Sequence, residues 1–499
     1  MTVRELLQAL AAAVPDQQIA IPASAALDVQ CTGVTHDSRR VTSGTVFVAL
    51  QGQKADGIEF APQAIAAGAA AIVAGRPTAV PSIVVADARL ALALLAAEFH
   101  GHPSRQMSVI GITGTNGKTT TAYLISAILN AAGMQSGLMG TVTYRIGDRD
   151  IQATRTTPEA PELQSMMRQM VDAGCRACVM EVSSHALALR RVDGIRFAAA
   201  VFTNLTRDHL DFHADMEDYF SAKRRLFELL PADAPALINA DDPRAAALGE
   251  TASQPITYGI NRPADVAPGP LSFSIDGLSF AVRTPHGTVR VRSKLVGKPN
   301  VYNILAAVGT TAALGVPPEA IERGLAGLSG VPGRFELAST PGDDITVIVD
   351  YAHTDDALRN LLETARPLAA RKLITVFGAG GDRDRTKRPL MGMVAARLSD
   401  VVVITSDNPR SEDPARIIDE VRLGAEPEVR QRGAEVLAIA DRREAIQQAI
   451  TRAAEGDMVL IAGKGHEKYQ EIAGKVHAFD DVAIAREALG ARRVRSRVS

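Results

Sequence analysis

The segment Gly-Ile-Thr-Gly-Thr-Asn-Gly-Lys-Thr-Thr at 111–120 constrains the fold of this chain more than any other stretch. It overlaps the end of the apolar run MSVIGI at 107–112, typical of a buried strand, and leads into a helical pattern from about 118 to 132. A glycine-rich turn between a strand and a helix directs backbone N–H groups and the helix N-terminus at a phosphate. In such a loop Lys118 would reach the β- and γ-phosphates of a nucleotide, and Thr119 would offer its hydroxyl to Mg²⁺. The pattern therefore predicts a doubly wound α/β unit that binds a nucleotide.

The loop departs from the usual phosphate-loop pattern G-x-x-x-x-G-K-[ST]. Ile112 stands at the first glycine position, and Gly111 lies one residue earlier. A glycine turn without a ligand rarely carries Lys-Thr-Thr, so nucleotide binding is the favoured interpretation. A dinucleotide oxidoreductase is disfavoured, because its G-x-G-x-x-G pattern fails at 378–383, where the last position is arginine.

The chain length of 499 residues corresponds to about three domains. Short apolar strands alternating with Ala-rich helical stretches predict a small α/β domain over 1–103. Buried-strand patterns and alternating hairpin patterns near 271–296 predict a central, mostly parallel sheet with a β-hairpin insertion over 104–332. The stretch SGVPGR, which contains glycine and proline, predicts a linker. After it, alternating strands and helices predict a Rossmann-like α/β domain over 333–499.

Charge and composition exclude some classes of function. The 54 Lys and Arg residues face 56 Asp and Glu residues, which leaves no positive excess for nucleic acid. Apolar stretches such as Leu90–Ala97 fall short of the roughly 18 residues that span a bilayer, and MTVRELLQAL lacks a signal-peptide layout. Cys175 and Cys178 form a lone C-x-x-C, which favours two buried thiols over a metal site. We therefore expect a cytoplasmic protein without membrane insertion. We also expect a monomer, although composition and charge do not bear on the oligomeric state.

Several further segments resemble motifs of the Mur ligase family, which includes folylpolyglutamate synthase, and GTNGKTT resembles its phosphate loop. In the family's order they are MEVSSHAL (180–187), FTNLTRDHLDFH (202–213), SAKRRLF (221–227), GKPNVYNILAA (297–307), GVPGRFE (330–336) and VDYAHTDDAL (349–358). The family's meso-diaminopimelate-adding branch is resembled by GGDRDRTKRP (380–389), SDNPRSEDP (406–414) and AGKGHEKYQ (462–470). The resemblance implies a cytoplasmic enzyme of peptidoglycan precursor synthesis. It would use ATP to join meso-diaminopimelate to the D-Glu γ-carboxylate of UDP-N-acetylmuramoyl-L-Ala-D-Glu through an acyl phosphate.

The resemblance also implies roles for individual residues at the nucleotide. ATP would be bound by Gly114, Thr115, Asn116, Gly117, Lys118, Thr119, Thr120, Asn300, Asn303, Arg334 and Asp350. Catalysis would rest on Lys118, Glu181, His209 and Lys223, and Mg²⁺ would be held by Thr119, Glu181, His209 and Lys223. Histidine is an unusual ligand for a hard cation, and a basic run such as AKRRLF is ordinarily a solvated helix face. Lys223 would be converted by CO₂ to a carbamate, which requires a neutral amine and hence a depressed pKa.

Two further groups of residues would bind the substrates. The UDP-linked dipeptide would contact His36, Ser38, Gln53, Lys54, Ala55, Thr156, Thr157, Ser183 and Arg191, where hydroxyls and cations suit a diphosphate and carboxylates. Diaminopimelate would contact Arg383, Asp407, Asn408, Pro409, Arg410, Gly463 and Glu467. Arg410 can clamp the distal carboxylate, while Glu467 and a backbone carbonyl can receive the distal ammonium.

Other functions stay open at this point. A lysine-adding ligase of the same family is disfavoured by Arg410, since lysine has no distal carboxylate to pair with a buried guanidinium. Folylpolyglutamate synthase is disfavoured by the diaminopimelate motifs. A non-catalytic switch driven by ATP is also compatible with a phosphate loop, because the loop by itself implies nucleotide binding only.

Overall fold

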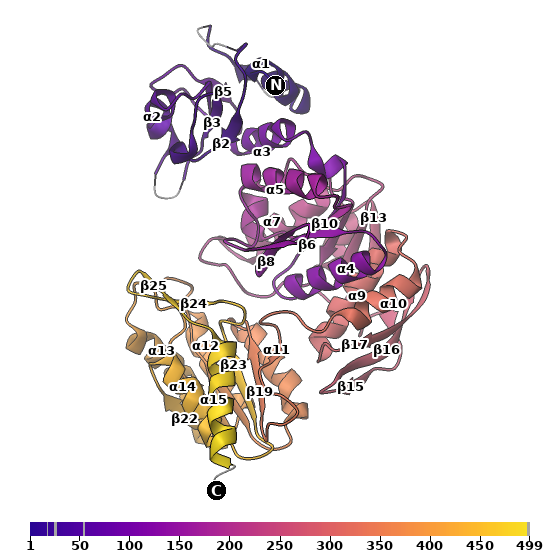
Figure 1. The fold of residues 1–499 in the computed structure, drawn as a ribbon, viewed down its shortest axis with the longest axis vertical. Helices are drawn as coiled ribbons and strands as arrows, with labels where there is room; N and C mark the ends of the chain where they lie inside the picture. Colours follow the sequence, from indigo (N-terminus) through magenta and orange to yellow (C-terminus); the bar gives the residue numbers. More distant parts are fainter. Residues whose placement is uncertain (17, 24–26, 53–54, 497–499) are drawn as a thin grey trace.

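The computed structural model describes residues 1–16, 18–23, 27–52 and 55–496. It has three α/β domains, with the central domain between the N-terminal domain and the C-terminal domain (Figure 1). The predicted fold class is therefore confirmed.

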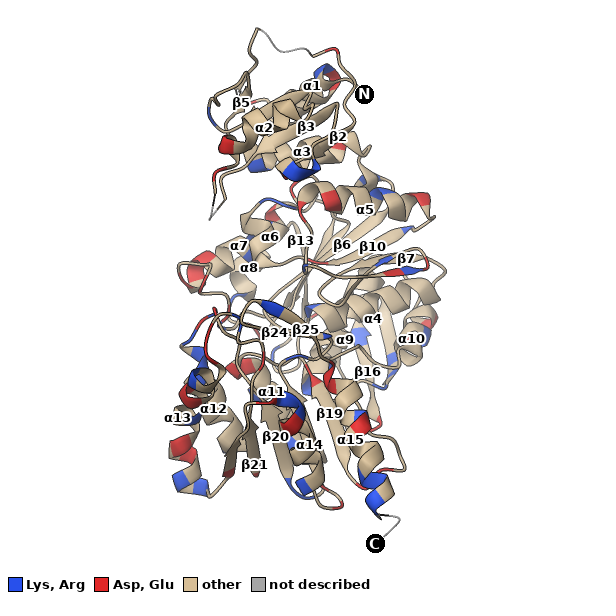
Figure 2. Ribbon diagram, turned by 60° about the vertical axis from the view of Figure 1, so that its left-hand side comes forward, with Lys and Arg blue, Asp and Glu red and all other residues tan. Residues whose placement is uncertain are grey.

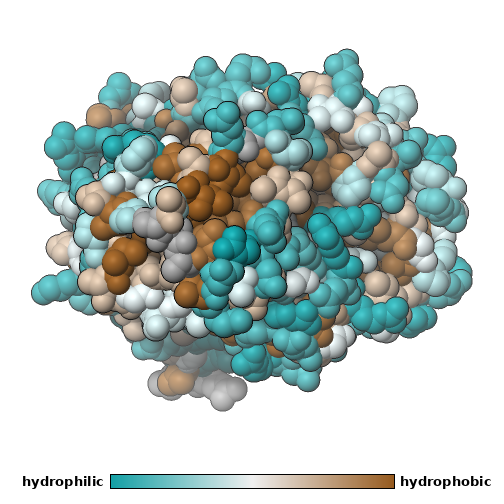
Figure 3. Space-filling model, turned by 90° about the horizontal axis from the view of Figure 1, so that it is seen from above, coloured by the Kyte–Doolittle hydropathy of each residue, from teal (hydrophilic) through white to brown (hydrophobic). Residues whose placement is uncertain are grey.

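The N-terminal domain is a small sheet covered by helices. Its elements are α1 (Val3–Ala13), β1 (Ile19–Ala20), β2 (Gly33–Thr35), η1 (Ser38–Arg40), β3 (Thr45–Ala49), η2 (Gly57–Phe60), α2 (Ala61–Ala66), β4 (Ala71–Ala74), β5 (Ile83–Val85) and α3 (Ala88–Phe99). The strand order is β1-β5-β4-β3-β2, antiparallel only between β1 and β5. Helix α1 begins in a capping box between Thr2 and Glu5. Viewed from this end of the molecule, hydrophobic residues are surrounded by hydrophilic ones (Figure 3). Ile21 and Val29 are among the exposed hydrophobic residues of this domain.

The central domain is a doubly wound sheet. Its elements are η3 (Pro103–Arg105), β6 (Ser108–Thr113), α4 (Lys118–Ala131), β7 (Ser136–Met139), β8 (Thr143–Ile146), β9 (Arg149–Gln152), α5 (Ala160–Asp172), β10 (Ala177–Glu181), α6 (Ser184–Ala188), β11 (Ala199–Phe202), α7 (Met216–Glu228), β12 (Pro235–Asn239), α8 (Ala245–Thr251), β13 (Gln254–Tyr258), α9 (Lys298–Ala313) and α10 (Pro318–Gly327). The strand order is β13-β12-β11-β6-β10-β7-β8-β9, parallel from β13 to β7. Along β6, Ile110 and Ile112 enter the core under α4 and α9, whereas Val109 enters the core under α5 and α7.

The predicted hairpin insertion is confirmed between β13 and α9. It consists of β14 (Ala267–Pro268), β15 (Ser272–Ser274), β16 (Gly277–Thr284) and β17 (Gly287–Ser293). Alternate residues of β16 are buried, and its apolar face joins the core cluster of α9 and α10.

The C-terminal domain is a second parallel sheet between helices. Its elements are β18 (Glu336–Leu337), β19 (Thr346–Asp350), α11 (Asp355–Ala365), η4 (Arg366–Leu368), β20 (Leu373–Phe377), α12 (Lys387–Leu398), β21 (Val401–Ile404), α13 (Pro414–Arg432), β22 (Glu435–Ala438), α14 (Arg442–Arg452), β23 (Met458–Ala462), β24 (Tyr469–Ile472), β25 (Lys475–Ala478) and α15 (Asp481–Ser496). The strand order is β18-β19-β23-β20-β21-β22, with only β18 antiparallel; β24 and β25 form a separate hairpin. The loops that follow β19, β20, β21 and β23 therefore meet at one edge of the sheet.

The two domain junctions differ in character. Helix α3 packs on α5, and Ala160 belongs to the hydrophobic core of the N-terminal domain. The contacts between the central and C-terminal domains include polar ones, such as the hydrogen bond from Asn116 Nδ2 to Asp356 Oδ2 at 3.0 Å. Acidic and basic residues are intermixed over the outer elements (Figure 2). Over the described ranges, no helix combines the length and the apolar character that crossing a membrane requires.

Candidate active site at the central and C-terminal domains

The phosphate loop 114–117 joins β6 to α4. Two of its glycines have positive φ angles. Gly114 has φ 146° and Gly117 has φ 88°. A Cβ atom at Gly114 would lie 1.8 Å from Thr203 Oγ1, and one at Gly117 would lie 2.4 Å from Asn303 Oδ1. Among the described residues no side chain caps α4, whose first N–H groups therefore stay available to an anion.

Lys118 and Thr119 begin α4 at this loop. Lys118 Nζ donates to Gly114 O and to Thr115 O, both at 2.9 Å. Burial lowers the pKa of Lys118, while the carboxylates of Glu181 and Asp208 raise it. The ammonium therefore lies folded across the loop, at the start of α4.

The other residues of the loop have partners in neighbouring elements. Thr115 Oγ1 donates to Thr206 O at 3.1 Å, and Asn116 contacts Asp356 in the C-terminal domain as described above. Thr120 is buried. The loop is thus fixed from the central domain and contacted by the C-terminal domain.

Lys223 lies inside the molecule, on the inward face of α7. Its side chain is 1% exposed, and its Nζ donates to Gly114 O at 2.8 Å. Nζ also lies 4.4 Å from the centre of the Tyr219 ring. Burial lowers the pKa of Lys223 well below its ordinary value, and the Lys118 ammonium acts in the same direction. The basic run of this helix is therefore not a solvated face at Lys223.

Glu181 lies at the carboxyl end of β10. Its Oε1 accepts from Thr141 N at 2.8 Å and its Oε2 from Thr141 Oγ1 at 3.0 Å. His209 follows β11 in a turn with φ 55°, its ring 4.9 Å from that of His185. Burial lowers the pKa of His209, as do the neighbouring His185 and Lys223. The imidazole is thereby kept neutral, the form that could bind a metal.

The donor atoms around the loop fit Mg²⁺ only together with a nucleotide. Within the described ranges no group of three or more His, Cys, Asp or Glu side chains could hold a metal ion. Mg²⁺ typically takes one or two carboxylates together with substrate phosphates. The hydroxyl of Thr119 and the carboxylate of Glu181 are oxygen donors of the required kind.

The interdomain linker is attached both to the phosphate loop and to the C-terminal domain. Arg334 Nη2 donates to Thr119 Oγ1 at 3.1 Å, and its guanidinium lies 4.7 Å from the centre of the Tyr351 ring. Asp350 accepts from Phe335 N at 2.7 Å. Burial raises the pKa of Asp350, against the effect of Arg334.

Gly333, next to Arg334, packs against the loop that follows β23. A Cβ atom at Gly333 would lie 2.0 Å from His466 N, and its own φ is 67°. Only a residue without a side chain lets the linker approach that loop so closely.

Asn300 and Asn303 lie on α9 behind the phosphate loop. Asn303 Nδ2 donates to Asn300 Oδ1 at 2.9 Å, and Asn300 Nδ2 donates to Val296 O at 2.8 Å. Thr121 Oγ1 donates to Asn303 Oδ1 at 3.4 Å. The helix therefore presents both amides beside the start of α4.

Four of the residues expected to bind the UDP-linked dipeptide meet beside Glu181. Thr157 Oγ1 donates to Glu181 O at 2.8 Å and accepts from Ser183 N at 3.1 Å. Arg191 Nη1 donates to Thr157 O at 3.1 Å. The hydroxyl of Thr156 lies 3.1 Å from that of Thr141, which bonds Glu181.

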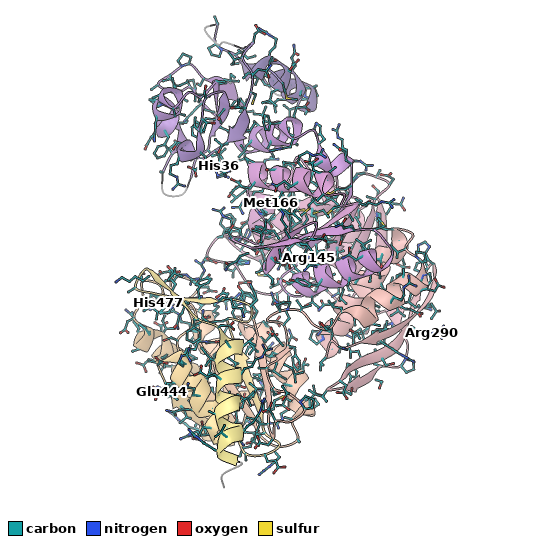
Figure 4. All side chains as sticks on the ribbon, in the orientation of Figure 1. His36, Arg145, Met166, Arg290, Glu444 and His477 are labelled. Carbon is teal, nitrogen blue, oxygen red and sulfur yellow. The ribbon has the colours of Figure 1, made fainter. Side chains whose placement is uncertain are left out.

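The remaining residues of this group belong to the N-terminal domain. Ser38 begins η1, and Ala55 is exposed in the next loop. His36 lies at the edge of the domain nearest the central domain (Figure 4), and within the described ranges its buried Nδ1 has no hydrogen-bond partner. Gln53 and Lys54 lie outside the described residues.

Most residues expected to bind diaminopimelate meet at the ends of β21 and β23. Asn408 Nδ2 donates to Glu467 Oε2 at 3.0 Å. Gly463 has φ 115°, and its Cβ would lie 3.3 Å from Asp407 Oδ2. Asp407 and Asn408 are buried. Burial and Asp407 raise the pKa of Glu467.

Arg410 lies beside the loop that follows β20. Its Nη1 donates to Gly381 O at 2.6 Å, and its Nε lies 3.5 Å from Glu471 Oε2. A Cβ at Gly381 would lie 1.9 Å from Pro409 O, so the two loops pack tightly. Arg383 of the same loop is exposed. Arg410 therefore already has a carboxylate neighbour, which weakens the expectation that lysine would leave it unpaired.

Sequence reasoning did not single out Lys464, which lies between Gly463 and Gly465. Its side chain is fully buried, and Nζ donates to Asn408 Oδ1 at 2.9 Å. One feature of the sequence could have pointed to Lys464: it lies two residues after the apolar run MVLIA of β23, at the end of a buried strand.

Comparisons with known proteins agree with the three-domain fold. Three family descriptions match: "Mur ligase family, catalytic domain" over 30–100, "Mur ligase middle domain" over 112–311 and "Mur ligase, glutamate ligase domain" over 333–465. The UDP-N-acetylmuramoyl-L-alanyl-D-glutamate--2,6-diaminopimelate ligase of Gloeobacter violaceus is 50% identical over 474 residues, which cover 94% of this chain and 96% of that protein. The chain belongs to the Mur ligase family.

A second relative and a solved structure are also similar to this Mur ligase over most of its length. The ligase of the same name from Geobacter metallireducens is 48% identical over 481 residues, covering 92% of this chain and 94% of that protein. A solved structure of a UDP-N-acetylmuramoyl-L-alanyl-D-glutamate--2,6-diaminopimelate ligase shares 33% identity and superposes with a TM-score of 0.69, covering 99% of both chains.

Proposed function

We propose that this Mur ligase uses ATP to join meso-diaminopimelate to the D-Glu γ-carboxylate of UDP-N-acetylmuramoyl-L-Ala-D-Glu. The reaction belongs to peptidoglycan precursor synthesis. The observation that carries the proposal is the group of charged side chains that follows β21 and β23, where Asp407 and Glu467 lie around Lys464 and the Arg410 guanidinium lies in the loop after β21. A guanidinium close to a group of carboxylates suits an amino acid whose distal carbon bears both a carboxylate and an ammonium. The names of relatives about 50% identical over most of the chain support the same substrate.

The reaction requires activation of a carboxylate, because joining it to an amine in water is uphill. Transfer of the ATP γ-phosphoryl group to the γ-carboxylate gives an acyl phosphate. The diaminopimelate amine then attacks the acyl carbon, and phosphate leaves, so that ADP, phosphate and one amide are formed. Lys118 and the open N–H groups of α4 stabilise the negative charge on the transferred group.

We assign the metal-binding role to Thr119, Glu181, His209 and a carbamate of Lys223. Bound Mg²⁺ would neutralise phosphate charge. The buried Lys223, whose pKa is lowered, supports formation of a neutral amine that can take up CO₂. The carbamate supplies the oxygen donors that a hard cation prefers.

The proposal extends to the boundaries of the domains and to location. We place the boundaries after residues 103 and 332, supported by separate sheets in the three ranges. Cys31, Cys175 and Cys178 are free and buried, which fits the reducing cytoplasm. We also assign a monomeric state, which sedimentation at several concentrations tests.

The deciding experiment measures phosphate release and product mass with ATP, the UDP-linked dipeptide and either diaminopimelate or lysine. A diaminopimelate ligase forms one amide per ATP, only with both co-substrates and preferentially with diaminopimelate. An ATP-driven switch would release phosphate without any amino acid, and a lysine ligase would prefer lysine. Lys118→Ala, expected to fold normally and to lose ligation, controls for contaminating ATPase activity.

A further inference from the structure

The buried ammonium of Lys464 lies among the side chains that we propose bind the amino acid, and these side chains are called the amino-acid pocket below. Nζ donates to Asn408 Oδ1 at 2.9 Å, lies 3.3 Å from Asp407 Oδ1 and lies 3.5 Å from Glu467 Oε2. It also lies 5.6 Å from the centre of the Tyr469 ring. The side chain of Lys464 is fully buried, so this cation contacts the pocket from the protein side.

The hydrogen bonds of Lys464 determine how the Asn408 amide is turned. Asn408 Oδ1 accepts from Lys464 Nζ and also from Glu471 N at 3.0 Å. The amide Nδ2 is thereby directed to Glu467 Oε2 at 3.0 Å. Without a donor at Lys464, the amide would lose one of the two hydrogen bonds that set its orientation.

Lys464 also sets the charge of the pocket. Two neighbouring cations are paired with carboxylates, Arg442 with Asp481 at 2.7 Å and Arg410 with Glu471 at 3.5 Å, so these pairs contribute no net charge. Asp407 and Glu467 with the single Lys464 ammonium leave one net negative charge. One negative charge matches one incoming ammonium, whereas two unbalanced carboxylates in a buried site would favour uptake of a proton.

We propose that Lys464 is a positioning residue for diaminopimelate, which orients the Asn408 amide and cancels one of two carboxylate charges, so that Glu467 meets the substrate ammonium in its ionised form. The inference rests on the proposed function. It differs from a purely structural ion pair because it ties Lys464 to the protonation of Glu467.

The groups around Glu467 determine the direction of the pH effect. Burial and Asp407 raise the pKa of Glu467, while Lys464 and the hydrogen bond from Asn408 lower it. Other groups with charge interactions with Glu467 are Arg442, Tyr351 and Tyr469. Loss of the Lys464 charge therefore raises the pKa of Glu467, and the carboxylate becomes protonated at a higher pH.

Two substitutions separate orientation from charge. Lys464→Gln keeps a donor for Asn408 without the charge, and Lys464→Met removes both. Lys468→Met is the matched control, because Lys468 lies four residues further on and forms a partly exposed pair with Asp480 at 2.8 Å. Kinetic constants for diaminopimelate, ATP and the UDP-linked dipeptide are measured from pH 5 to 9, with melting temperatures.

In Lys464→Gln, we expect KM for diaminopimelate to rise about tenfold at pH 7 and the acid limb of kcat/KM to move up by about one pH unit. KM for ATP should stay unchanged, and Lys464→Met should show a larger rise for diaminopimelate. Lys468→Met should behave like the native protein. An unshifted acid limb in Lys464→Gln, or equal losses for all three substrates, would overturn the inference.

A measurement on the native protein covers the case in which both variants fail to fold. Calorimetry in two buffers of different ionisation enthalpy gives the protons exchanged when diaminopimelate binds, with a non-hydrolysable ATP analogue and the UDP-linked dipeptide present. We expect almost none at pH 7; exchange of about one proton would overturn the inference. Failure of the native protein to use diaminopimelate would instead count against the proposed function.

Discussion

Buried cations in this protein differ in what neutralises them. Arg388 bonds Glu412 and Glu420, and Arg442 bonds Asp481. Within the described residues, by contrast, no carboxylate forms an ion pair with Lys223, whose contacts include a carbonyl oxygen and an aromatic ring. An ammonium with neutral partners is the one most readily deprotonated, and this distinguishes a reactive lysine from structural cations.

At Lys223, the change to Ala should lower ligation at least about 100-fold, because the proposed carbamate oxygens are lost. A small carboxylic acid such as formate should restore part of the activity, and Lys223→Arg should be inactive, since arginine forms no carbamate. The measurement is the initial rate of ligation against added acid. Arg224→Ala is the control, because Arg224 is half-exposed and pairs with Glu228 at 3.0 Å. Native activity in Lys223→Arg would contradict the carbamate role.

At Arg410, the change to Ala should reduce the preference for diaminopimelate over lysine about 30-fold, which corresponds to about 2 kcal/mol. The value lies at the lower end for a lost charge pair, because Glu471 already compensates part of the guanidinium charge. Kinetic constants for both amino acids give the ratio. Glu471→Gln should change the ratio in the opposite direction, since it leaves Arg410 more dependent on the substrate carboxylate. Equal proportional losses with both amino acids would show that Arg410 only supports the loop.

Among the elements, the helices α12 and α13 hold the loop that follows β20. They approach backbone to backbone, since a Cβ at Gly392 would lie 2.0 Å from Val421 O. Arg388 joins them through Glu412 and Glu420, both at 2.7 Å, and donates to Gly380 O at 3.1 Å. The position of the loop beside Arg410 therefore depends on the ion pairs of the buried Arg388 with two partly exposed carboxylates.

The Glu412 interaction predicts how acid weakens this pair of helices. Hydrogen bonds from Arg388 lower the pKa of Glu412 from 4.5 to about 2. Because the folded-state pKa is depressed, the stabilisation is complete above the unfolded value and is lost as pH falls from about 4.5 through about 2. Glu412→Gln should cost about 2 kcal/mol at pH 7 and flatten this part of the curve of melting temperature against pH. Glu426→Gln, at an exposed pair with Arg430, should leave the curve unchanged.

The sequence pattern predicted most of the buried parallel strands, because these are short apolar runs next to turn signals, but it did not predict β7, whose sequence SGLM contains a glycine and a serine. It did not predict β9 or the β24–β25 hairpin, because β9 and β25 are exposed along their length and owe their form to pairing with a neighbour. The positions of Thr115, Lys118 and Thr119 in a strand–turn–helix loop could be predicted from glycine spacing. The inward position of Lys464 could not, since spacing does not say which side chain of a loop is buried. Nor could the contact between Asn116 and Asp356, 240 residues apart.

For the whole molecule, the two junctions predict which domain moves. Apolar packing of α3 on α5, with the ion pair of Arg190 and Asp87 at 2.6 Å, attaches the N-terminal domain to the central domain. The C-terminal domain contacts the phosphate loop through polar groups, which can exchange these hydrogen bonds for hydrogen bonds with water. Polar interdomain contacts of this kind are typical of domains that reorient. We expect the C-terminal domain to move and the other two to stay together.

The pair of Arg207 and Asp384, 3.1 Å apart, tests this expectation. Asp384→Asn should raise KM for diaminopimelate up to about fivefold, corresponding to at most about 1 kcal/mol for a partly exposed pair. Small-angle scattering with a bound ATP analogue should show a larger radius of gyration for the variant. A double-mutant cycle with Arg207→Ala isolates the pair, and Arg145→Ala, which breaks a pair within the central domain, is the control. Additive effects of the two substitutions would contradict the role in closure.

The close packing of Gly333 against His466 is expected to couple the binding of the nucleotide to the binding of the amino acid. The linker bonds Thr119 of the phosphate loop through Arg334, while its backbone lies against the loop that carries Glu467. We therefore expect a nucleotide that fixes the linker also to act on the affinity for the amino acid. Coupling free energy is reciprocal, so the factor by which ATP tightens diaminopimelate must equal the factor by which diaminopimelate tightens ATP. The cell's supply of either substrate would then set how well the enzyme captures the other.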